Sequence, residues 1–180
     1  MANDLHKYTV QESTNIVACP RLIDVDCTTT TADYDDNDVI FNWTEVPNIA
    51  RNKGDAIELV SASALLPAAM GDQKGLVQLV FARGIGDTGS TPAALGTLDA
   101  AVSITRANAV LAQICGSCLI GGEEDDLVLS NISSNEQGGL RLIMAPAIQS
   151  TSLWVAGVAR AEPAAAFTAT TINLYLGIYG

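Results

Sequence analysis

Charged side chains are scarce in this sequence, and basic ones are the scarcest. Only 16% of the 180 residues are charged, and 9 Lys and Arg stand against 20 Asp and Glu, for a formal net charge of -11. The basic residues are scattered along the chain and form no cluster. Because proteins bind phosphate backbones through clustered Lys and Arg, this composition predicts no nucleic-acid partner.

Long hydrophobic runs are also missing. No apolar stretch approaches the ~20 residues that a membrane-spanning helix needs, and the run 62–70 is interrupted by Pro67. The first residues, Met1–Lys7, lack the basic and apolar regions of a secretory signal peptide. We therefore expect no membrane partner and a soluble chain made in the cytoplasm.

Cysteine chemistry has little support. The run Cys115-Gly116-Ser117-Cys118 could be a redox dithiol, half of a zinc site or a papain-like nucleophile. However, it follows a predicted helix instead of opening one, Cys19 and Cys27 have the wrong separation for a second zinc pair, and the single histidine is His6. We expect the four cysteines to be buried free thiols.

Two acidic runs could hold a cation. Asp33–Asp38 resembles the start of an EF-hand loop, but the sixth and twelfth positions hold Asp38 and Thr44 where the motif needs Gly and Glu. The run Glu123–Asp126 places four carboxylates side by side, which is typical of an exposed turn. We expect both runs to be solvated, with a looser calcium site at the first as the alternative.

The aromatic content, 5%, is low for a sugar-binding platform. Trp43 and Trp154 both lie within strand patterns, which favours core packing over ligand stacking. No pair of carboxylates has a spacing that points to glycoside hydrolysis. We assign no catalytic, cofactor-binding or metal-binding residue, and we predict that the protein is not an enzyme.

Alternating apolar residues dominate what is present. In Leu76–Phe81, Val77, Leu79 and Phe81 share one face, as expected for a central strand of a sandwich. In Asp38–Val46, we expect Val39, Phe41 and Trp43 to share a face. Similar patterns predict strands at 56–64, 113–120, 126–130, 140–144, 153–160 and 171–179, with weaker signals at 8–10, 16–18 and 22–26. Turn residues predict loops at 27–37, 84–96, 133–139 and 161–169.

One helix is expected, over 103–111, with Ser103 as the N-cap and with Ile104, Ala107 and Leu111 on one face. It is short, and we expect it to plug one end of the sandwich. The predicted fold class is all-β, an antiparallel β-sandwich with one short helix near 103–112. We expect a single domain over 1–180, with 1–37 as an N-terminal arm or edge strands.

Several segments resemble, in this order, small virion structural proteins of tailed bacteriophages, notably marine ones. They are 38–48, Leu79-Val80-Phe81, the loop ending at Leu95-Gly96, 101–104 with its helix, 127–130, 153–160 and 174–178. The resemblance covers roughly 38–180; the pair Cys115 and Cys118 and the longer loop 84–96 depart from it, so no disulfide is carried over.

This resemblance implies a jelly-roll-like β-sandwich that sits on the outer capsid surface as a decoration or cement protein and bridges capsomers. Its partners would be the major capsid protein and further copies of itself, as a homotrimer. A composition with 48% hydrophobic and few charged residues suits such subunit contacts. The alternative is a virion-borne host-adhesion or carbohydrate-binding module, since sandwiches serve both roles.

Overall fold

A computed structural model describes residues 20–66, 76–121, 128–129, 132–160, 167 and 169–180. These residues form strands joined by loops, with one short helix, α2 (Arg106–Leu111). The strands are β1 (Pro20–Thr28), β2 (Val39–Val46), β3 (Ile57–Leu66), β4 (Val77–Ala82), β5 (Ile114–Ile120), β6 (Val128–Leu129), β7 (Ile132–Gln137), β8 (Leu142–Met144), β9 (Leu153–Ala159) and β10 (Thr171–Tyr179). No helix in this part of the chain is long and apolar enough to cross a membrane.

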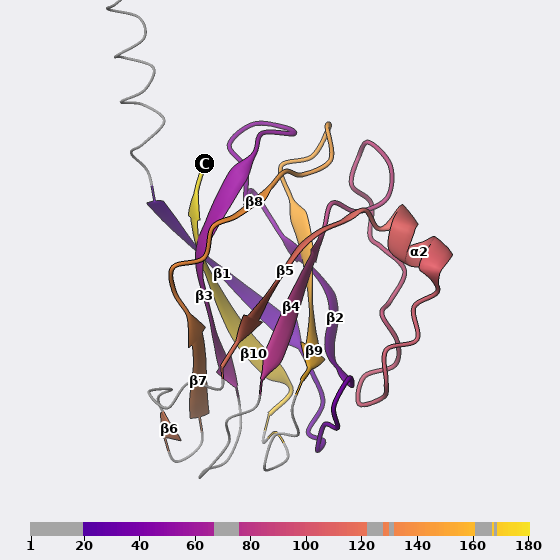
Figure 1. Cartoon of the computed structure of the whole chain (residues 1–180), viewed down its shortest axis with the longest axis vertical. Helices are drawn as coiled ribbons and strands as arrows, with labels where there is room; N and C mark the ends of the chain where they lie inside the picture. Colours follow the sequence, from indigo (N-terminus) through magenta and orange to yellow (C-terminus); the bar gives the residue numbers. More distant parts are fainter. Residues whose placement is uncertain (1–19, 67–75, 122–127, 130–131, 161–166, 168) are drawn as a thin grey trace, which may run out of the picture.

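The strands make two antiparallel sheets that pack as two layers (Figure 1). The six-stranded sheet has the order β1-β10-β3-β7-β6, with β8 also paired to β3, and the four-stranded sheet has the order β2-β9-β4-β5. The pairs β1 with β10, β2 with β9, β3 with β7 and β4 with β5 are nested, as if one long hairpin had been rolled up. This is the topology of a jelly roll, and it confirms the predicted all-β sandwich.

Strict alternation builds the inner core between the sheets. In β10, Ile172, Leu174, Leu176 and Ile178 are buried, while the residues between them are only partly so. The predicted central strand is confirmed as β4, whose Val77, Leu79 and Phe81 point into this core. Side chains of both sheets meet there because successive residues of a strand point to opposite faces.

The prediction for β2 was wrong in one respect, because Val39, Phe41 and Trp43 do not share a face. Phe41 joins the inner core, whereas Val39 and Trp43 belong to a second apolar cluster. The register with β9 shifts on both sides of Phe41, and each shift turns the following side chains over. The Phe41 ring fills the space beside Gly157, where an added Cβ would lie 2.2 Å from the ring atom Cε1.

The observed helix is shorter than the predicted one, and it does not occupy the predicted place at the end of the sandwich. Its N-cap is Thr105, not Ser103, and the Thr105 side chain accepts a hydrogen bond from the Asn108 backbone N at 3.3 Å. None of its six residues is buried, so the helix does not plug the sandwich. It lies outside the four-stranded sheet (Figure 1), and its neighbours Ile104 and Ala112 make the apolar contacts.

Two predicted loops also need correction. Most of 133–139 is strand β7, and the loop 27–37 begins within β1 and buries Thr29 and Tyr34. The Tyr34 hydroxyl lies 2.6 Å from the Thr29 hydroxyl, which donates to the Ile40 carbonyl.

The weak strand signals at 8–10 and 16–18, the acidic run 123–126 and most of 161–169 lie outside the described residues. The single domain over 1–180 therefore stays a prediction.

Candidate functional site

The outer face of the four-stranded sheet is covered by the long connection 83–113 between β4 and β5. A second apolar cluster forms there, separate from the inner core, and we call it the outer cluster. Its buried members are Val39, Trp43, Ala82, Leu95, Ala112, Ala156 and Val158. The four-stranded sheet is thus apolar on both faces, whereas a sandwich sheet usually exposes one face to water.

Side chains of the sheet hold this connection in place by bonding to its backbone. The Trp43 indole N–H donates to the Ala93 carbonyl at 2.8 Å, and the Trp154 indole N–H donates to the Gly89 carbonyl at 2.9 Å. The Asn42 amide donates to the Gly96 carbonyl and accepts from the Leu95 N–H. Trp43 is therefore buried in the outer cluster, and the partly buried Trp154 packs against it, which agrees with the predicted packing role of both side chains.

The glycine-rich loop 84–96 is fixed by its own backbone as well. Ile85 and Ser90 exchange two backbone hydrogen bonds, at 2.7 and 3.0 Å. Gly84 has a φ of +89°, and an added Cβ would lie 2.6 Å from the Gly89 carbonyl oxygen. Only glycine fits this crossing of two backbone segments.

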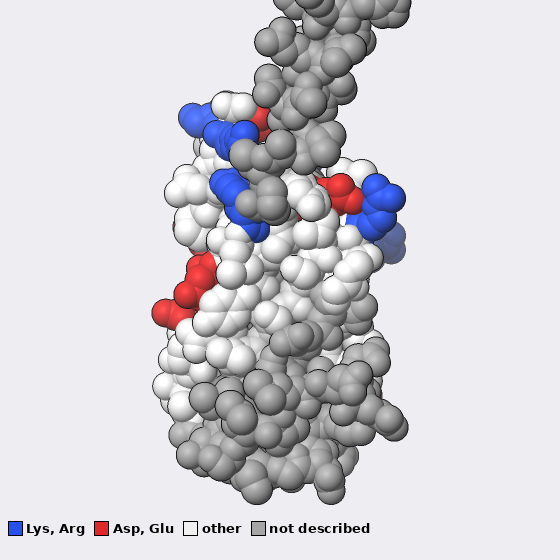
Figure 2. Space-filling model, turned by 90° about the vertical axis from the view of Figure 1, so that its left-hand side faces the viewer, with Lys and Arg blue, Asp and Glu red and all other residues white. Residues whose placement is uncertain are grey.

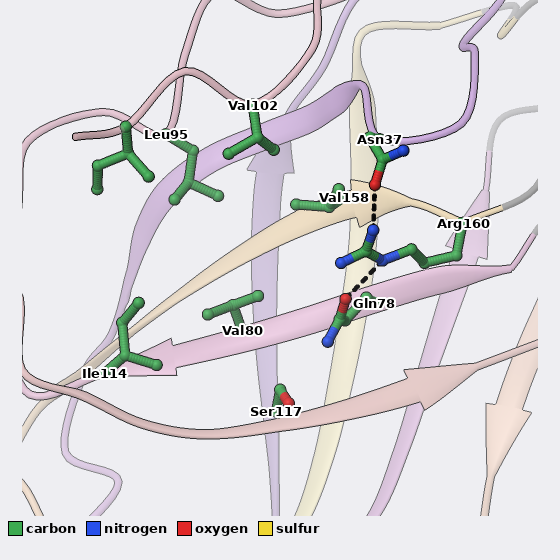
Figure 3. A pocket seen from close by; sticks show the side chains of 10 residues that line it. Asn37, Gln78, Val80, Leu95, Val102, Ile114, Ser117, Val158 and Arg160 are labelled. Carbon is green, nitrogen blue, oxygen red and sulfur yellow. Dashed lines mark hydrogen bonds between the residues drawn. The ribbon is translucent and has the colours of Figure 1, made fainter. Parts of the chain in front are cut away.

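Where the connection 83–113 ends, an open groove of about 450 Å³ remains over the outer face (Figure 3). Val80 of β4 and Val158 of β9 line it from the sheet, Val102 lines it from the connection, and Ile114 and Ser117 come from the edge strand β5. The other lining residues are Asn37, Gln78, Leu95, Ile104 and Arg160. The groove is therefore aliphatic over most of its length.

Polar side chains gather at one end of the groove, around Arg160 (Figure 3). The Arg160 Nε donates to the Gln78 Oε1 at 2.6 Å, and its Nη1 donates to the Asn37 Oδ1. The Arg160 backbone N donates to the Leu76 carbonyl at 2.8 Å, which fixes the base of the side chain. Both described side-chain partners are neutral amides, and a guanidinium has five N–H donors.

Charges are sparse on the side of the molecule where the six-stranded sheet lies. Figure 2 shows that most of the described surface there carries neither Lys and Arg nor Asp and Glu. The ion pair between Arg141 and Glu58, with 3.0 Å between Nε and Oε1, is an exposed one. Exposed pairs of this kind stabilise a fold only weakly.

The described cysteines are free thiols, as predicted, and Cys27 and Cys118 are buried, whereas Cys115 is only partly buried. Burial raises the pKa of Cys27 and Cys118 to about 12 and that of Cys115 to about 11. Thiols with such values are poor nucleophiles at neutral pH, because little thiolate is present. Cys19 lies outside the described residues.

The acidic run 33–38 is mostly exposed, as predicted, but Asp38 is buried. The Asp38 carboxylate accepts a hydrogen bond from the Asp35 backbone N at 2.9 Å, which closes the turn. Within the described part of the chain, no group of three His, Cys, Asp or Glu side chains could hold a metal ion.

Sequence reasoning missed the groove and the residues at its polar end. Two signals were available: Gln78 interrupts an otherwise apolar strand, and Arg160 directly follows the apolar run of β9. Asn37 gave no comparable signal within its acidic loop. Nothing in the sequence indicated that these three residues meet.

Comparisons with known proteins give little more. No family model matches the chain, and no curated protein matches it. One similar solved structure is the crystal structure of the T13 IBDV viral particle, with 12% identity, a TM-score of 0.20, and 89% of this chain aligned to 39% of that one. Another is the structure of the infectious bursal disease virus Gx strain, with 10% identity, a TM-score of 0.21, and 89% aligned to 41%. This chain spans about two fifths of their length.

Proposed function

We propose that this protein is a structural component of a tailed-phage virion. In this proposal it binds the outer surface of the capsid as a decoration or cement protein and stabilises the head by bridging capsomers. The major capsid protein is its partner, and it acts as a homotrimer and not as an enzyme. The sequence resemblance over 38–180 supports this proposal.

The observation that carries the proposal is a set of exposed aliphatic side chains around the groove, which we call the aliphatic face. It consists of Val102, Val110, Leu111, Ile114 and Leu119, which are between 39% and 68% exposed. Val102 and Ile114 line the groove, and Leu119 lies further along β5. Val110 and Leu111 are the last two residues of α2, which precedes β5 in the chain. Gathered apolar side chains of this kind mark contacts with other proteins, because water solvates them poorly.

A jelly roll alone assigns no function, so the proposal rests on the surface. A stable interface buries about 800 Å² on each partner, and its centre is depleted of charged residues. The aliphatic face and the low charge of the chain meet this second condition. A sugar-binding role gains no support from Trp43 and Trp154, whose indole N–H groups bond to the protein's own backbone.

Cryo-electron microscopy of phage particles that carry the protein tests the proposal directly. We expect copies over the whole capsid, in contact with the major capsid protein and grouped in threes. A few copies confined to the tail would replace the proposal by the adhesion alternative. Absence from the particles, or copies on the inside of the capsid, would refute a role as a decoration protein.

A further inference from the structure

The groove combines an aliphatic lining with a positively charged end. Its length is lined by aliphatic side chains of β4, β9 and the connection 83–113, and one end carries the Arg160 guanidinium (Figure 3). An aliphatic lining favours an apolar occupant, whereas a guanidinium favours a carboxylate. An occupant that satisfies both must carry an acidic group next to aliphatic groups.

The Arg160 side chain is already oriented by hydrogen bonds before a carboxylate binds. The amide oxygens of Gln78 and Asn37 accept two of its five N–H donors, which fixes the plane of the guanidinium, and no carboxylate of the described residues bonds to it. The remaining donors can bind a carboxylate in the paired geometry that arginine favours. Because the side chain is already oriented, little conformational entropy is lost when a carboxylate binds.

The surroundings favour a polypeptide as the occupant. The groove is open, and the exposed Leu119 pairs in register with the lining residue Gln78, while the exposed Val110 and Leu111 end α2, close in sequence to the lining residue Ile114. A small carboxylic acid would leave these side chains in water, whereas an extended segment can cover the groove and its margins together. A polynucleotide carries a negative charge on every phosphate, so the net charge of -11 opposes it much more strongly than a segment with a single carboxylate.

We infer that this groove binds an extended segment of the protein's docking partner, with a Glu or Asp side chain on Arg160 and flanking aliphatic side chains on Val80, Val102 and Val158. The inference rests on the proposed function for the partner, which is then a surface segment of the capsid. The chemistry of recognition follows from the groove itself.

Two short peptides test the chemistry, namely acetyl-Ser-Leu-Glu-Val-Ser-amide and the same peptide with Gln in place of Glu. Binding is followed by NMR shifts of the Arg160 side-chain Nε–H and of the Val80, Val102 and Ser117 backbone amides. We expect the Glu peptide to bind about tenfold more tightly, because Gln offers the guanidinium one neutral acceptor oxygen in place of two charged ones. Shifts elsewhere only, or equal binding of the two peptides, would overturn the inference.

The matched variants are Arg160→Gln and Arg141→Gln, which remove one guanidinium each, the second in the exposed pair with Glu58. Arg160→Gln should abolish the preference for the Glu peptide, and Arg141→Gln should leave it unchanged. If Arg160→Gln does not fold, Val102→Asp serves instead, because its added carboxylate at the exposed rim should repel the Glu peptide more than the Gln peptide. Unchanged preference in the folded variant would contradict the inference.

Binding to capsids that lack the protein separates the two proposals. Loss of capsid binding in Arg160→Gln but not in Arg141→Gln supports both. Normal binding of Arg160→Gln refutes the groove as the contact and leaves the decoration role standing. Peptide binding by a protein that never binds capsids refutes the decoration role only. If sedimentation shows that Arg160→Gln dissociates an oligomer instead, the occupant is a second copy and the inference is wrong.

Discussion

The inner core and the outer cluster lie on opposite faces of the same four-stranded sheet and are built differently. The inner core joins strands of both sheets through alternating side chains, such as Val77, Leu79 and Phe81. The outer cluster joins the sheet to a long connection, and bonds from Asn42, Trp43 and Trp154 hold that connection in place. The first depends on strand periodicity, and the second depends on a few individual side chains. We therefore expect mutations to affect the two regions differently.

The largest loss of stability is expected from Phe81→Ala, which leaves a cavity in the inner core. Phe81 is fully buried, and truncating a buried aromatic side chain costs about 3–5 kcal/mol of unfolding free energy. Urea denaturation measures the loss. Asp35→Ala in the exposed acidic loop is the control, with a change below about 0.5 kcal/mol. A larger loss at Asp35 than at Phe81 would reveal a binding site in that loop and would favour the calcium alternative.

A smaller loss of stability is expected from Gly157→Ala, which adds a methyl group where β2 packs closely against β9. The added methyl group would overlap the Phe41 ring, so the ring or the strand must shift. Overpacking of this kind costs about 1–3 kcal/mol. Thermal unfolding measures it, and Gly157→Ala combined with Phe41→Leu should recover part of the loss. If the second substitution adds its full cost instead, Phe41 is not the side chain that Gly157 accommodates.

In the outer cluster, Trp43→Phe should cost about 1 kcal/mol, since it removes the hydrogen bond to the Ala93 carbonyl but keeps most of the apolar ring. The informative measurement is hydrogen exchange. The backbone N–H groups of Leu95 and Ser103, in the connection, should exchange faster, while those of β10 should not change. Equal acceleration in both places would show that the two regions unfold together and that the contrast between them does not hold.

The smallest effect is expected from replacing Cys115 and Cys118 together by Ala, which should leave the protein folded. Burial raises the pKa of both thiols above the usual 9.0, so the unfolded chain loses these protons first as pH rises. The stability that they contribute is complete below pH 9 and is lost as pH rises from there toward 11–12. The melting temperature of the native protein should therefore fall more steeply over this range than that of the variant. Parallel curves would argue against buried thiols.

The sequence by itself determined most of the strands and the fold class, because alternation with a period of two reports directly which face of a strand is buried. It did not reveal β7, whose residues Ile132–Gln137 are mostly polar and therefore show no such alternation. It also placed Trp43 with Phe41, because an irregularity in strand pairing depends on the partner strand and leaves no trace in the periodicity of β2 itself.

Only the tertiary structure decided the candidate site. Asn37 comes from a loop, Gln78 from β4 and Arg160 from the position that follows β9, and no signal in the sequence indicated that the three meet. They meet because β9 pairs with both β2 and β4, which brings residues 123 positions apart within hydrogen-bonding distance. Periodicity encodes which way a side chain faces, but only the pairing of strands encodes which distant side chains it faces.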